Sequence, residues 1–112
     1  MIEIEILKVN NNIESISIQG HANSAKFGND IVCAAVSVLS QGVINGMIKS
    51  LDGRDDFFSL SNDGKIKISI PKDVNDIQKI KLQTLADVLE INFDDLSKTY
   101  NEYINLEVKE VG

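Results

Sequence analysis

The pattern that most limits the fold of this chain of 112 residues is a long helical repeat in its first half. From Asn29 to Leu51, apolar residues recur at spacings of three and four, which predicts one buried face on a helix of about six turns. Asn29 or Asp30 can cap its start, and Asp52-Gly53 can end it. The apolar positions are Val32, Val36, Leu39, Val43, Met47 and Leu51.

Shorter segments with a period of two surround this helix. Residues 2–6 and 15–19 alternate apolar with polar side chains and are separated by Asn10-Asn11-Asn12, as in a hairpin with one buried face. A second pair, residues 57–60 and 65–70, is joined by Ser61-Asn62-Asp63-Gly64, and residues 103–111 alternate once more. These segments predict five strands.

Pro71 ends the fourth strand, and Asp73 is a candidate cap for a second helix. The predicted apolar face of that helix consists of Ile77, Ile80, Thr84, Val88 and Ile91. The element order is therefore ββαββαβ. It indicates an α+β fold, a single two-layer domain over residues 1–112 with a mostly antiparallel sheet and two helices against it.

Composition excludes several classes of function. The formal charge is −6 and Lys and Arg form no cluster, so independent binding to nucleic acid is not expected, whereas a basic partner is. The alternating N-terminus does not resemble a signal peptide, and we expect no membrane span. The single cysteine favours a reducing compartment, which suggests the cytoplasm.

Two side chains carry the candidate chemistry. Cys33, the only cysteine, is predicted in the first helical turn, where unpaired N–H groups and the helix dipole stabilise a thiolate. His21, the only histidine, follows the second strand, and a return loop over residues 22–29 can bring it to Cys33. The alternatives are that Cys33 is a small buried apolar residue and that His21 is an ordinary surface residue.

Neighbouring residues can support this pair. Asp30 precedes Cys33 by one turn and Ser37 follows it by one turn, although Asp30 can be only a cap and Ser37 only a small packing residue. Gly20 and Gly28 are candidate hinges for an opening loop, and Phe27 is a candidate lid or an anchor to the core. One His and one Cys cannot form a zinc site, so no metal or other cofactor is expected.

The segment Gly20-His21-Ala22, followed after a short loop by residues 28–37 (Gly-Asn-Asp-Ile-Val-Cys-Ala-Ala-Val-Ser), closely resembles the signature of the ribosomal-processing cysteine proteases called Prp. The resemblance extends over the whole chain in length and element order. It implies a homodimeric α/β cysteine protease that removes the N-terminal extension of large-subunit ribosomal protein twenty-seven. By position in the motif, His21 would be the general base and Cys33 the nucleophile, with Asp30 and Ser37 in support.

Two other functions remain open on sequence alone. One is a ribosome-assembly module without enzymatic activity, in which His21 and Cys33 are incidental. The other is a redox-responsive thiol protein, although the chain contains no second cysteine to resolve an oxidised Cys33. Shortening of the extended ribosomal protein would distinguish the protease from both.

Overall fold

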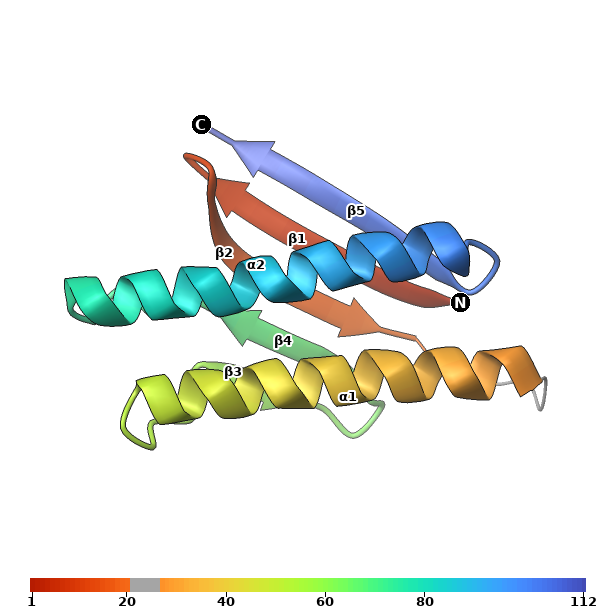
Figure 1. The fold of residues 1–112 in the computed structure, drawn as a ribbon, viewed down its shortest axis with the longest axis horizontal. Coiled ribbons are helices and arrows are strands. Elements are labelled where there is room, and N and C mark those ends of the chain that lie inside the picture. The colour runs from red at the N-terminus through yellow and green to blue at the C-terminus, as the bar shows by residue number, and fades with distance from the viewer. Residues whose placement is uncertain (21–26) are drawn as a thin grey trace.

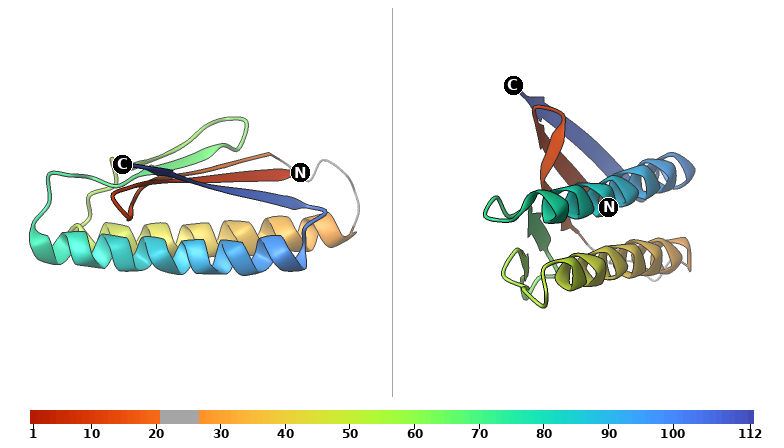
Figure 2. Two further views of the ribbon diagram at one scale, coloured as in Figure 1. Left: turned by 90° about the horizontal axis from the view of Figure 1, so that it is seen from above. Right: turned by 60° about the vertical axis from the view of Figure 1, so that its left-hand side comes forward.

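A five-stranded sheet with two helices on one face forms the molecule (Figure 1; Figure 2). The computed structural model describes the backbone of residues 1–20 and 27–112, and the side chains of residues 1–20 and 31–112. The elements are β1 (Ile2–Val9), β2 (Asn12–Gln19), α1 (Phe27–Ser50), β3 (Phe58–Leu60), β4 (Ile66–Ser69), α2 (Asp76–Thr99) and β5 (Ile104–Val111). The predicted order ββαββαβ is confirmed.

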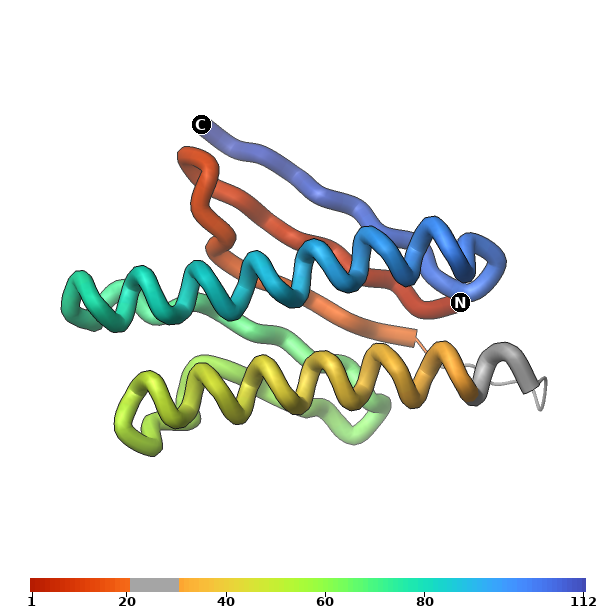
Figure 3. The backbone as a smooth tube through the Cα atoms, in the orientation of Figure 1, coloured from red at the N-terminus to blue at the C-terminus, as the bar shows by residue number. Residues whose placement is uncertain are grey.

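The strands lie in the order β3-β4-β2-β1-β5. Three neighbouring pairs are antiparallel, and only β1 and β5 run parallel, as the tube in Figure 3 shows. Asn10 and Asn11 have φ values of 50° and 70° in the β1–β2 turn, where asparagine tolerates the left-handed conformation. The sheet is therefore mostly antiparallel, as predicted.

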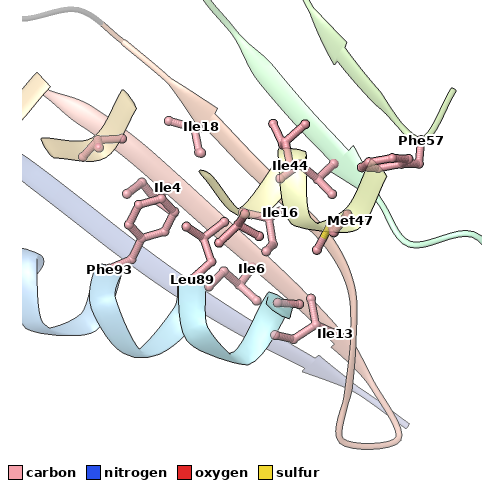
Figure 4. Close-up of a cluster of buried hydrophobic side chains, with 14 of the residues drawn as sticks. Ile4, Ile6, Ile13, Ile16, Ile18, Ile44, Met47, Phe57, Leu89 and Phe93 are labelled. Carbon is pink, nitrogen blue, oxygen red and sulfur yellow. The ribbon is translucent and has the colours of Figure 1, made fainter. Parts of the chain in front are cut away.

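The core lies between the sheet and the helix layer (Figure 4). Ile4 and Ile6 of β1 and Ile16 of β2 point from the sheet toward Leu89 and Phe93 of α2. From α1, the buried residues include Val32, Val36, Val43, Ile44, Met47 and, just past its end, Leu51. The predicted apolar face of the first helix is thus confirmed, with Leu39 partly buried at its margin.

The predicted face of the second helix is wrong. Leu82, Ala86, Leu89 and Phe93 are its buried residues, whereas Ile77, Ile80, Val88 and Ile91 are 43–67% exposed. Two apolar stripes run along α2, and the stripe that contains Ala86 faces the sheet. The other stripe, which has the stronger β-branched pattern, faces outward.

The predicted cap at Asp73 is also wrong. Asn75 caps α2 by accepting from the Gln78 backbone N–H, and the Gln78 side chain in turn accepts from the Asn75 N–H, forming a capping box. Asp73 instead accepts from Arg54 at 3.0 Å, and Arg54 also binds Asp56. The Arg54 hydrogen bond holds the pKa of Asp56 below its usual value. These contacts connect the loop after α1 to the loop before α2.

The first helix begins earlier than predicted. α1 starts at Phe27, so Asn29 and Asp30 lie within the helix and neither is its cap. Its end agrees with the sequence, because Asp52 and Gly53 take φ values of 55° and 95° immediately after it. The predicted loop over residues 22–29 therefore lies partly outside the described residues, and its last three residues, 27–29, are helical.

Among the described residues, one helix is long and apolar enough to cross a membrane by length and composition alone, a test that the core helix of a soluble protein also passes, so the expectation of no membrane span stays a prediction. The helix is the segment Ile31–Ser50 of α1, with a mean hydropathy of 1.8. In the structure, this helix packs on the sheet through Val32, Val36 and Met47. Val43 and Ile44 are buried with them, whereas Ile31 and Val38 are exposed, Val38 at 71%.

Candidate active site

Cys33 lies on α1 at the margin of the core. Because the helix begins at Phe27, Cys33 is its seventh residue and belongs to the second turn, so the predicted position in the first turn is wrong. Its thiol is free, and the side chain is partly buried against the core residues. The thiol of Cys33 is therefore packed against the core on one side and partly exposed on the other.

Ser37 follows Cys33 by one helical turn and is exposed. Ser40 lies one further turn along the same side of α1. It is the one buried polar side chain among the described residues, and it was not among the predicted site residues. Its hydroxyl donates to the Val36 carbonyl at 2.7 Å, so its hydrogen bond is made within the helix. The spacing 33-37-40 was the signal that could have identified it. Its contacts assign it a packing role.

The strand end that leads to His21 is fixed by Gly20. Gly20 has a φ of 100°, and a Cβ built there would lie 2.3 Å from the Met1 carbonyl oxygen. Only glycine combines this backbone conformation with so close an approach. The positive φ and the close approach to Met1 explain the glycine and place the point where the chain leaves β2. The hinge role of Gly20 stays a prediction.

His21 itself lies outside the described residues, as do the side chains of Phe27, Gly28 and Asp30. Both flanks of His21 are nevertheless placed. β2 ends at Gln19, α1 begins at Phe27, and both ends lie at the end of the molecule that carries the N-terminus (Figure 1; Figure 2). Cys33 lies in the second turn of that helix, and His21 directly follows Gly20, so the fold brings the two segments to the same region.

Gly20→Ala is expected to lower the free energy of unfolding by about 2 kcal/mol or more, because the added Cβ meets backbone and the φ is unfavourable. Gly42→Ala is the matched control. A Cβ there meets nothing within 4 Å, and a helical glycine replaced by alanine gains about 0.5–1 kcal/mol. Urea unfolding of both variants measures the difference, and equal stability would contradict the assigned role of Gly20.

The described residues contain no group of three or more His, Cys, Asp or Glu side chains that could hold a metal ion. One hollow among the described residues lies between the β1–β2 hairpin, the end of β4 and the first half of α2, and its lining includes Ile13, Ile70 and Gln83. Gln83 holds the hairpin there by binding both the N–H and the carbonyl of Ile13, at 2.9 and 2.7 Å. Cys33 and Ser37 do not line this hollow.

Comparison with known proteins identifies the family. A family model described as cysteine protease Prp matches residues 1–105. The chain is 30% identical over 97 residues to the ribosomal processing cysteine protease Prp of Staphylococcus aureus, covering 87% of this chain and 88% of that protein. It is 28% identical over 95 residues to the protein of the same name from Bacillus subtilis, covering 84% of each. The chain belongs to the Prp family of cysteine proteases.

Solved structures agree with this fold. SMU.848 from Streptococcus mutans matches with a TM-score of 0.79 and 27% identity, over 99% of this chain and 96% of that chain. The essential ribosomal processing protease Prp of S. aureus, crystallised with a substrate peptide, matches with a TM-score of 0.78 and 23% identity, over 97% and 100% of the two chains. At that identity, the second similarity supports the fold.

Proposed function

We propose that this protein is an endopeptidase that removes the N-terminal extension of large-subunit ribosomal protein twenty-seven, with Cys33 as nucleophile and His21 as general base. The observation that carries the proposal is the placement of the chain's only cysteine at an accessible margin of α1, in a chain that matches the Prp family over residues 1–105. The S. aureus relative crystallised with a substrate peptide supports a peptide as substrate.

The chemistry follows from these two side chains. His21 accepts the thiol proton, and the sulfur of Cys33 attacks the carbonyl carbon at the end of the extension. The peptide C–N bond then breaks, His21 returns the proton to the leaving amine, and the extension stays on Cys33 as a thioester. Water activated by His21 hydrolyses this thioester and restores the free thiol.

The start of α1 offers donors for the developing oxyanion. The N–H groups that begin a helix, here those of residues 27–29, have no carbonyl partner within the helix. Helical side chains lean toward the N-terminus, so the sulfur of Cys33 leans toward this first turn. Backbone N–H groups of this turn are therefore the proposed oxyanion donors. Asp30 and Ser37 are proposed to support His21 and Cys33 from the adjoining turns.

The setting proposed for the reaction is the cytoplasm, with the enzyme as a homodimer. A chain with a formal charge of −6 is suited to a basic ribosomal protein, because opposite net charges accelerate the encounter without choosing the bond to be cleaved. The free thiol of Cys33 is compatible with a reducing compartment.

Incubation of the purified protein with the extended ribosomal protein tests the proposal. We expect a shorter product, identified by intact mass and N-terminal sequencing, at substoichiometric enzyme, and no change in the same ribosomal protein made without its extension. Binding of the extended protein with no shorter product would contradict the proposal and support a non-enzymatic assembly module instead.

A further inference from the structure

The side of α1 that carries Cys33 is turned away from α2. Gly46 marks the other side, because a Cβ built there would lie 3.3 Å from the Leu85 side chain of α2. Cys33 precedes Gly46 by thirteen residues, which places it roughly 140° around a helix of 3.6 residues per turn. The buried residues Val36 and Met47 lie between these two sides and face the core. Cys33 is therefore on the far side of the core contact from α2.

On that side the sheet ends in β3. α2 contacts β2 and β5, whereas α1 lies over β3 and β4 (Figure 1; Figure 4). Because the strand order is β3-β4-β2-β1-β5, no strand of the described chain lies beyond β3. The side of α1 that carries Cys33 is therefore next to an open edge of the sheet.

The open edge of β3 has unpaired backbone groups. The Phe57 carbonyl accepts from the last residue of β4 at 2.8 Å, and the Ser61 N–H donates to the residue before β4 at 2.9 Å. Residues of an antiparallel strand bond alternately to one side and the other. The N–H and carbonyl groups of Phe58 and Leu60 therefore point away from β4, toward the open edge.

An exposed apolar side chain accompanies these groups. Leu60 is 66% exposed, although it pairs with Ile66, which packs against the core. Partners across an antiparallel pair share a face, so the Leu60 side chain lies on the face that carries the helices. Ile66 also pairs with Ile18, near the end of β2 that leads to Gly20, so Leu60 lies at the end of β3 closer to the predicted site. Such an edge is suited to pairing with an extended peptide.

The nucleophile is within reach of a peptide on this edge. Ile44 follows Cys33 by eleven residues, about three turns, so the two lie on the same side of α1 and about 16 Å apart along it. Figure 4 shows Ile44 on the side of the core toward Phe57, the residue before β3. An extended chain covers ~16 Å in about five residues. A short segment can therefore pair with β3 and continue to the sulfur of Cys33.

The chemistry selects the direction of this peptide. The extension is absent from the mature protein, so an enzyme that holds the extension releases its main product after cleavage. A chain parallel to β3, running from Phe58 toward Leu60 and then to Cys33, places the extension on the edge and the mature part beyond it. The opposite direction would hold the mature part, which persists in the product.

We propose that the residues of the extension that precede the cleaved bond bind as an additional strand along the open edge of β3, parallel to it. This inference rests on the proposed function and assigns the surface that recognises its substrate. Backbone groups of Phe58 and Leu60 pair with the peptide, and the exposed Leu60 side chain packs against an apolar side chain of the extension.

Leu60→Pro tests the pairing, because it removes an N–H that points to the open edge and leaves the bonds to β4 in place. The KM for the extended ribosomal protein is expected to rise about tenfold, the effect of about one lost hydrogen bond. Alkylation of Cys33 by iodoacetamide should keep the wild-type rate, and circular dichroism should be unchanged.

Val108→Pro is the matched control on the other edge strand. The carbonyls of Tyr103 and Val111 accept from the two ends of the β1 segment, so the N–H of Val108, at an even-numbered position between them, points outward from β5. This variant should keep the wild-type KM. Equal KM values for Leu60→Pro and Val108→Pro would overturn the inference while leaving the peptidase activity established.

Amide exchange measured by NMR gives a second test that needs no variant of β3. In the Cys33→Ala protein saturated with a synthetic peptide that spans the cleaved bond, exchange at Phe58 and Leu60 should slow at least ~10-fold, and exchange at Val108 should not change. Unchanged exchange at both β3 amides in the saturated protein would overturn the inference. A wild-type protein that does not shorten the extended ribosomal protein would instead overturn the proposed function, and this inference with it.

Discussion

Replacing Cys33 with alanine is expected to abolish peptide cleavage, lowering the turnover rate by about 10⁴-fold or more. The substitution removes the sulfur that forms the acyl intermediate, and no other cysteine in the chain can replace it. Cys33→Ser is expected to be similarly inactive, because a hydroxyl is far harder to ionise near neutral pH than a thiol.

The fold should survive the substitution at Cys33. Its side chain is only partly buried, so the cost in unfolding free energy should stay near 1 kcal/mol. Ser40→Ala, two turns further along α1, is the control that removes a small polar group without touching the chemistry. Wild-type turnover by Cys33→Ala in a mass-based cleavage assay would end the protease hypothesis.

Replacing His21 with alanine is expected to reduce cleavage by about 10²–10⁴-fold, the usual contribution of a positioned general base. It should also slow alkylation of Cys33 near neutral pH, because His21 no longer accepts the thiol proton. His21 is the only histidine in the chain. A difference between the pH profiles of the two proteins therefore cannot come from another imidazole.

Alkylation rates across pH, followed by intact mass, provide the measurement for His21. Asn23→Ala lies two residues further along and is the control for a general disturbance of this segment. If His21→Ala and the wild type react at the same rate at every pH, the two residues do not communicate, and the assignment of His21 as base is wrong.

Much of the architecture could be predicted from residue spacing. β1, β2 and β5 show alternation, and α1 shows spacings of three and four. Both patterns depend only on which positions face the core, so they can be recognised from the sequence alone. His21 and Cys33 can be identified from sequence because each is the only residue of its type in the chain. They also lie in the two halves of the motif, Gly20-His21-Ala22 and residues 28–37.

Three details needed the structure. The buried face of α2 could not be read from sequence because two stripes fit a helix equally, and packing selected the one with Ala86. The start of α1 was misplaced because Asn29 and Asp30 favour a cap, a preference of only about 1 kcal/mol that the longer helix overrides. The demand for glycine at position 20 arises from the Met1 carbonyl, which is distant in sequence.

The central claim, that one thiol performs the cleavage, is tested most directly by titrating that thiol. Because the chain has a single cysteine, partial treatment with iodoacetamide gives proteins with at most one thiol label, and intact mass gives the labelled fraction. Cleavage of the extended ribosomal protein should fall in proportion to that fraction and reach zero at one label per chain. Cleavage that persists when Cys33 is fully alkylated would contradict the account.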